Sequence, residues 1–315
     1  MRTAYGIYRG LQIYLETYAN DPELDEHFKS GVQLGTGLSS LMLSLLPSKV
    51  MKVCHESFKP NRANSCEAAC LAELQPVDED KQDQAALNTM MAEVPRNLKK
   101  IAGKSLPIEK FVSRKARKFA SQNHRLILPA IELSYFFGTL PNAPPRLQFG
   151  AILPRIESHI NSLAQSTPES YNHGSGYWDD YCLAHFLRGV ALSFAAYPHE
   201  EALITEEDYK AYPDGAKAAG EEAMGSFKHL LEHAIDIQLD HWIIYFTHYE
   251  MGRLYSQMGD NESAKHELEL VMSGKTLEVN TQARSQGKYS MESALMIRVH
   301  AGLQAIKEDP RTRIH

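Results

Sequence analysis

Residues 248–271 read HYEMGRLYSQMGDNESAKHELELV, with small and large side chains spaced as in two helices that pack against each other. Gly252 and Ala264 are small at the two positions where crossing helices would bring their backbones close together. Tyr255 is large enough to fill the space beside that crossing, and residues 259–260 provide the turn. The stretch therefore predicts a helix–turn–helix unit.

This spacing is that of the tetratricopeptide repeat, a unit of about 34 residues with W-x2-L-G-x2-Y in its first helix. The residues in those first-helix slots are His248, Met251, Gly252 and Tyr255. Only the initial aromatic residue is missing. Because such repeats stack side by side, the pattern predicts an all-α fold of helical hairpins stacked into a solenoid-like domain.

A second, weaker copy of the repeat lies upstream and is interrupted between its two helices. Its pattern residues are His185, Arg188, Gly189 and Leu192 in the first helix, and Ala223 and Phe227 in the second. Gly189 and Ala223 are 34 positions apart whereas Gly252 and Ala264 are 12 apart, so this copy carries 22 extra residues. These lie between Tyr197 and Gly220 and predict a solvated loop.

Helical periodicity along the chain divides it into three parts. We expect an N-terminal helical segment at residues 1–53, a weakly structured linker at 54–103, and the repeat-like helical domain at 104–315. Apart from the repeats, the third part is expected to hold a hairpin of two helices, at residues 126–140 and 147–163.

A final helix is predicted to close the repeat stack. Ser290 is a suitable N-cap residue, and the helix would run to about Ile306. Leu295, Val299 and Gly302 lie on its apolar face, which would pack on the preceding repeat.

The composition excludes several classes of protein. With 315 residues, 43% of them hydrophobic and 23% charged, the chain is neither wholly disordered nor a multispanning membrane protein. A net charge of -6 and a pI near 6.2 argue against a globally nucleic-acid-binding surface. Four cysteines and no secretion pattern at the N-terminus favour a reduced compartment, so we expect the cytoplasm or the nucleus.

The sharpest catalytic motif is an H-x-x-E-H match formed by His229, Glu232 and His233. In inverted zinc proteases, two such histidines bind zinc while the glutamate activates water. Here the motif follows the repeat-packing residues Ala223 and Phe227, and no third ligand is identifiable in a chain with 14 histidines. We therefore expect surface histidines and no catalytic, cofactor-binding or metal residue; a zinc-dependent hydrolase is the alternative.

Two weaker motifs lie near the N-terminus. Cys54, His55, Cys66 and Cys70 offer four zinc ligands, but the C-x3-C spacing falls in an Ala-rich, helical piece and favours free or buried thiols. Residues 35–37, Gly-Thr-Gly, resemble a dinucleotide-binding loop, yet Ser40 replaces its last glycine and no strand precedes it. The apolar stretch around them is too short for a membrane span, so a buried helix is expected, with contact to a membrane or lipid surface as the alternative.

The chain has one strongly basic run, from Arg96 to Lys118, with nine Lys or Arg and one Glu. Such a charge favours phosphates or anionic lipid headgroups. Because Phe111 and Phe119 belong to an apolar stripe, the run has no aromatic platform for bases, and no nucleic acid is expected as a partner. A solvated helix face is the expected interpretation, and peripheral lipid contact is the alternative.

Five stretches of the chain carry a family resemblance. They are GVQLGTGLSSLMLSLLPSKVMKV at 31–53, LPIEKFVSRKARKF at 106–119, LPAIELSYFFGTL at 128–140, HYEMGRLYSQMGDNESAKHELE at 248–269 and KYSMESALMIRVHAGLQAI at 288–306. They resemble the fungal inclusion-body-clearance proteins, which are related to the animal tetratricopeptide repeat protein 39 group. Members of that family are longer, so the chain resembles a shortened member. All five are packing motifs, so no site residue is carried over.

The resemblance implies a non-enzymatic adaptor that takes part in clearing protein inclusion bodies with lipid-droplet proteins during stress. It implies other proteins as partners, including aggregated or lipid-droplet proteins, and no cofactor. Stacked helix pairs offer a concave face for a partner peptide or helix, and binding there needs no catalytic residues. The oligomeric state and the residues of that face stay open.

Overall fold

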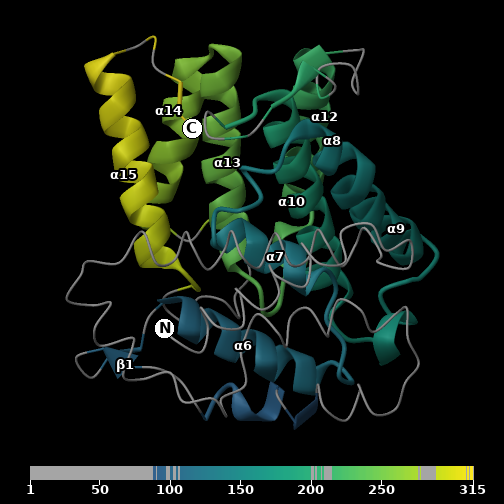
Figure 1. Ribbon diagram of the computed structural model, residues 1–315. Helices are drawn as coiled ribbons and strands as arrows, with labels where there is room; N and C mark the ends of the chain where they lie inside the picture. The colour runs from purple at the N-terminus through teal and green to yellow at the C-terminus, as the bar shows by residue number, and fades with distance from the viewer. Residues whose placement is uncertain are drawn as a thin grey trace, which may run out of the picture. The chain divides into compact units, whose positions relative to one another are not determined.

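The computed structural model describes residues 107–199, 215–275 and 289–309, parts of 88–105, and single positions at 202–208, 277 and 311–314 (Figure 1). All of these residues belong to one compact unit, Asn64–His315. Helices dominate this part of the chain, which confirms the all-α class.

Two helical hairpins form the predicted repeat stack. The first pairs α10 (Tyr177–Ala196) with α12 (Gly215–Leu231), and the second pairs α13 (Trp242–Met258) with α14 (Asn261–Met272). The helices α10, α13 and α15 (Glu292–Glu308) stand side by side (Figure 1). The tetratricopeptide-like stacking of hairpins is therefore confirmed.

The predicted small residues stand where the helices of each hairpin approach most closely. A Cβ atom added at Gly189 would lie 2.4 Å from Cε1 of Phe227, and one at Gly252 would lie 3.1 Å from the carbonyl oxygen of Ala264. Ala264 and Phe227 are completely buried. Both hairpins thus close through a glycine in the first helix, as the sequence pattern predicted.

We expect Gly189→Ala to destabilise the fold by about 1–3 kcal/mol, because the added methyl group overpacks the crossing and pushes the Phe227 ring off its rotamer. Gly225→Ala on α12 is the matched control, since a Cβ there meets nothing within 4 Å. It should stabilise the helix by roughly 0.5–1 kcal/mol through helix propensity. Denaturant unfolding measures both changes, and a Gly189→Ala chain as stable as wild type would contradict this crossing.

Helices α6 (Pro107–Ser121), α7 (Pro129–Phe136), α8 (Pro145–Leu147) and α9 (Leu153–Ala164) precede the repeats. A π-helical turn, η1 (Gln148–Ile152), joins α8 to α9. Pro154, in the first turn of α9, has no N–H for the helical ladder. The predicted hairpin of residues 126–140 with residues 147–163 is not formed in that way, because α9 packs mainly against α10. The shorter α7 instead lies across the repeats.

The last helix, α15, packs against α14 and α13 and buries its predicted apolar face. Its start differs from the prediction. Met291, with a φ of 63°, takes the N-cap position, and the helix begins at Glu292. The Ser290 hydroxyl accepts a hydrogen bond from Arg114 of α6 at 2.6 Å instead of capping the helix.

Short elements precede α6 around the end of the predicted linker, where β1 lies inside it and β2 just beyond it. Strand β1 (Lys100–Ile101) pairs antiparallel with β2 (Lys104–Ser105), and this pairing was not predicted from the sequence. The predicted segment 1–53, most of the linker, and residues 200–201, 203, 207 and 209–214 of the insertion lie outside the described residues. The end of the insertion is not the solvated loop that was predicted, because α12 already begins at Gly215 and Gly220 is buried. Among the helices that are described, none has the length and apolar character needed to cross a membrane.

Candidate protein-interaction surfaces

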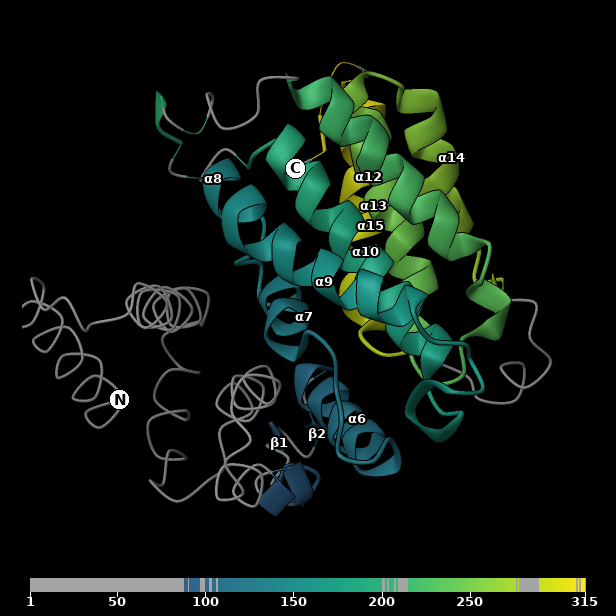
Figure 2. The same ribbon diagram turned by 90° about the vertical axis from the view of Figure 1, so that its right-hand side faces the viewer.

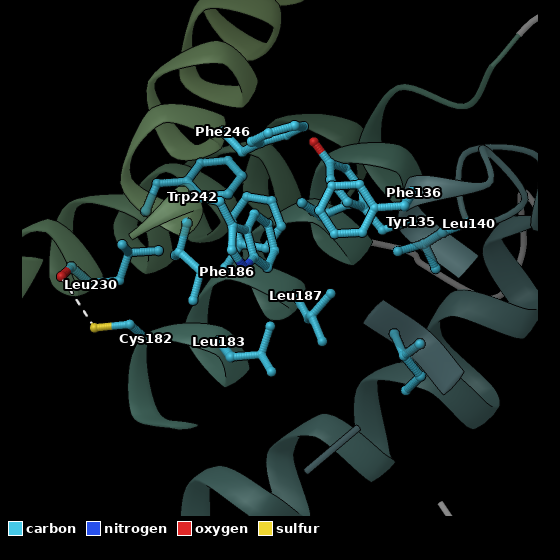
Figure 3. Packing of buried hydrophobic residues seen from close by; sticks show 14 of the residues in the cluster. Tyr135, Phe136, Leu140, Cys182, Leu183, Phe186, Leu187, Leu230, Trp242 and Phe246 are labelled. Carbon is cyan, nitrogen blue, oxygen red and sulfur yellow. Dashed lines mark hydrogen bonds between the residues drawn. The ribbon is translucent and has the colours of Figure 1, made fainter. Parts of the chain in front are cut away.

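The inner face of the repeat stack, formed by α10 and α13, is covered by α7 of the same chain. Tyr135 of α7 contacts Phe186 and Phe246, with ring centroids 5.1 and 6.0 Å apart. Phe136 packs on Trp242 at 4.8 Å and on Phe246 at 5.3 Å. Figure 3 shows these rings meeting in one buried cluster, and Figure 2 shows α7 on the side of α10 and α13 away from α14. The α7 helix therefore lies where a repeat stack presents its concave face.

The polar groups beneath α7 are bonded within the chain. The Tyr135 hydroxyl donates to Glu250 Oε1 at 2.7 Å, and Arg253 Nε donates to Glu250 Oε2 at 2.8 Å. The Arg253 guanidinium also donates to Ser193 and lies 3.9 Å from the ring centroid of Phe194. Burial, together with the charge of Glu250, raises the pKa of Tyr135, so its hydroxyl stays a donor. The concave face predicted to receive a partner is thus filled over α10 and α13.

A buried cluster of charges fastens α6 to the repeats. Lys118 Nζ lies 3.0 Å from Asp180 Oδ1 and 2.7 Å from Asp240 Oδ2. Lys115 Nζ lies 2.8 Å from Asp240 Oδ2 and 2.5 Å from Glu132 Oε1 of α7. Burial works against the charges, but the two lysines hold the pKa of Asp240 well below its usual range. We call these residues the buried charge cluster: Lys115, Lys118, Glu132, Asp180 and Asp240.

The basic run is therefore only in part the solvated face that its sequence predicts. Lys110, Arg114 and Arg117 are exposed, whereas Lys115 and Lys118 are buried. Neutralising the two lysines would test stability rather than binding to lipid or phosphate.

Glu132 gives the buried charge cluster a pH dependence. Burial raises its pKa from the ordinary value of 4.5 to about 7, although Lys115 opposes the rise. Folding therefore binds a proton at Glu132, and stability should fall as pH rises from about 4.5 to 7. Glu132→Gln keeps the shape of the neutral carboxylic acid, so in this variant the stability should fall less between pH about 4.5 and 7. Urea unfolding across that window measures the effect; identical pH profiles for variant and wild type would contradict it.

Aromatic and imidazole rings gather on the surface where the start of α10 meets the end of α12. Trp178 stacks on His233 with centroids 4.1 Å apart, and Tyr181 lies 4.5 Å from His185. His185 in turn lies 4.9 Å from His229. We call this the aromatic–histidine surface: Tyr177, Trp178, Tyr181, His185, His229 and His233.

This surface is partly exposed to solvent and has an apolar border. None of its six residues is buried, and the His229 side chain is 48% exposed. Two large apolar residues that follow α12, Ile235 and Leu239, are about half exposed. Partly exposed aromatic side chains beside exposed aliphatic ones are typical of a surface that binds another protein.

The centre of the aromatic–histidine surface is uncharged at neutral pH. Partial burial, with smaller contributions from His229, Arg188 and His233, lowers the pKa of His185 to about 4. Burial also raises the pKa of Tyr181 to about 12. Both side chains therefore present neutral rings, which favours contact with apolar groups.

The H-x-x-E-H residues lie around the end of α12, and His229 and His233 belong to the aromatic–histidine surface. Tyr181 bonds to His229 Nε2, while His229 Nδ1 lies 3.3 Å from Glu232 and His233 Nδ1 lies 3.5 Å from Asp236. In the described part of the chain, no group of three or more His, Cys, Asp or Glu side chains is placed to hold a metal ion. Cys54, His55, Cys66, Cys70 and the Gly-Thr-Gly motif lie outside that part.

Trp178, Tyr181 and Asp240 are functional or structural positions that the sequence analysis missed. Trp178 and Tyr181 precede the repeat pattern of α10, and only the packing of α10 on α12 brings them to the histidines. The pair Asp179–Asp180, at the start of a mostly apolar helix, was one signal in the sequence for the buried charge cluster. Carboxylates that become buried in such a helix require charged or hydrogen-bonding partners.

Comparison with known proteins places the chain among helical-repeat proteins. The family model described as Iml2/Tetratricopeptide repeat protein 39 matches residues 1–66 and 64–193. Tetratricopeptide repeat protein ttc-39B of Caenorhabditis elegans is 26% identical over 227 residues, which are 72% of this chain and 32% of that protein. The chain thus spans about a third of the length of this curated relative. No solved structure matches the chain.

Proposed function

Because the chain belongs to the Iml2/Tetratricopeptide repeat protein 39 family, we propose that it is a non-enzymatic adaptor in the clearance of aggregated protein, acting with lipid-droplet proteins. The repeat stack and the family support a protein-interaction role. The proposed location is the cytoplasm, and also the nucleus, with movement onto inclusions or lipid droplets when protein folding is disturbed.

We propose that the aromatic–histidine surface binds the apolar segments that aggregated proteins expose. Because α7 fills the inner face of α10 and α13, we base this proposal on the surface where partly exposed aromatic rings gather in the described part of the chain. Tryptophan and tyrosine contribute strongly to binding when a partner covers them. The neutral rings at its centre and the bordering Ile235 and Leu239 match an apolar ligand.

A fluorescent fusion observed beside a lipid-droplet dye tests this function in cells. During folding stress, the wild-type chain should move onto inclusions or droplets, and a Trp178→Ala/Tyr181→Ala variant should stay diffuse. Lys265→Ala/Glu269→Ala on α14 is the matched control, because both residues are exposed and lie on another helix. A folded wild-type fusion that remains diffuse under stress would contradict the proposal.

A further inference from the structure

Two residues after α15, Arg313 and Ile314, lie against α13 and form what we call the attached segment. Its Ile314 side chain is 7% exposed, whereas Arg311 nearby is almost fully exposed. Asp309, directly after α15, has an extended backbone, which turns the chain out of the helix. Ile314 is therefore buried, whereas Arg311, three residues earlier, is exposed to solvent.

Two neighbouring side chains of α13 bind the backbone of Ile314. The Ile314 N–H donates to Ser256 Oγ at 3.2 Å, and Gln257 Nε2 donates to the Ile314 carbonyl oxygen at 2.8 Å. Paired donor and acceptor contacts to one backbone unit do not depend on the identity of its side chain. They are the kind of contact by which proteins hold a peptide segment.

The side chain of Ile314 is held separately, against α15 and α14. A Cβ atom added at Gly302 would lie 3.2 Å from Ile314 Cδ1 and 3.3 Å from Leu268 Cδ1, so the missing side chain of Gly302 makes room for Ile314. The space beside Gly302 and Leu268 accepts a branched aliphatic side chain.

The residue before Ile314 adds a charge preference. The guanidinium of Arg313 lies beside Gly259, which ends α13 in a left-handed conformation; a Cβ there would lie 3.3 Å from Arg313 Nη2. The C-terminal end of a helix carries a partial negative charge, which attracts a cation. A basic residue followed by a branched aliphatic residue therefore suits this position.

We infer that Ser256, Gln257, Leu268 and Gly302 form a peptide-binding site whose present occupant is the chain's own Arg313–Ile314 segment. The site takes a peptide of a partner protein that carries a basic residue followed by isoleucine or valine. The attached segment competes with such a peptide at an effective concentration in the millimolar range. The site lies on α13, α14 and α15, away from the aromatic–histidine surface on α10 and α12.

The test uses the full chain and a labelled peptide of residues 308–315, EDPRTRIH, in a fluorescence-anisotropy titration. Ile314→Asp releases the attached segment, so this variant should bind the peptide at least about tenfold more tightly than wild type. A control peptide with Asp in place of the isoleucine should not bind. Adding Gln257→Ala to the Ile314→Asp chain should weaken binding, because it removes the donor to the peptide carbonyl.

Three results would overturn the inference. The first is an Ile314→Asp chain with wild-type helicity and melting temperature that does not bind the peptide. The second is equal binding of the two peptides. The third is a wild-type dimer that Ile314→Asp dissociates, because the segment would then join two copies. None of these measurements involves aggregated protein, so they fail or succeed independently of the proposed function.

Discussion

Lys118→Met is expected to lower the free energy of unfolding by about 3–5 kcal/mol, because removing one partner of a buried ion pair leaves charges without compensation. Lys118 Nζ is shared by Asp180 and Asp240, and all three side chains are nearly inaccessible to solvent. Methionine keeps the length and apolar stem of lysine but cannot neutralise either carboxylate. Lys115 still contacts Asp240, so Asp180 is the carboxylate that loses most.

The matched control for this prediction is Lys110→Met on the same helix, where the lysine is exposed. An exposed substitution of this kind should change stability by less than about 0.5 kcal/mol. Denaturant unfolding gives both values under the same conditions. Equal free energies of unfolding for the two variants would contradict the claim that the buried charge cluster stabilises the packing of α6 on the repeats.

Trp242→Ala is expected to cost about 3–5 kcal/mol, the range for truncating a buried aromatic residue. The Trp242 indole meets Phe111 of α6, Phe136 of α7 and Phe186 of α10, with ring centroids 5.9, 4.8 and 5.4 Å away. It is 1% exposed, so its removal leaves a cavity bordered by three elements. Because α6 and α7 share this cavity, they should also become easier to cleave by protease.

Trp178→Ala provides the comparison, since Trp178 is partly exposed at the start of α10. Its loss should cost clearly less stability than that of Trp242, and the variant should stay folded for binding experiments. Calorimetric melting of the two variants tests this order. A melting temperature of Trp242→Ala equal to or higher than that of Trp178→Ala would contradict the packing of α7 on the repeats.

The repeat stack was predictable from the sequence because its signals are local. The small residues Gly189, Gly252 and Ala264 stand at fixed spacings within each hairpin, and the close approach of the helices explains them. The 22-residue interruption did not obscure the first hairpin, since Ala223 and Phe227 keep their own spacing.

The filling of the inner face was not predictable in the same way. Tyr135 and Glu250 are 115 positions apart, and no periodic pattern links a short apolar helix to a surface so distant in the sequence. The basic run shows the same difficulty. Lys115 and Lys118 resemble exposed lysines until the packing brings Asp180 and Asp240 to them.

Only the histidines of the aromatic–histidine surface could be recognised from the sequence. The H-x-x-E-H motif marked His229 and His233, and its residues do lie on an exposed face. Their aromatic neighbours come from α10, some 50 positions earlier, so a motif search cannot join them. The packing of α10 on α12 gives the histidines their aromatic surroundings.

Binding to aggregated protein in vitro tests the central claim most directly. The purified chain is sedimented with a heat-aggregated model protein, and the bound fraction is compared for wild type, Trp178→Ala/Tyr181→Ala and the Lys265→Ala/Glu269→Ala control. Wild type and control should co-sediment at equal levels, while the Trp178→Ala/Tyr181→Ala variant stays in solution. Equal co-sedimentation of all three folded chains, or of none, would contradict the claim that the aromatic–histidine surface binds aggregated protein.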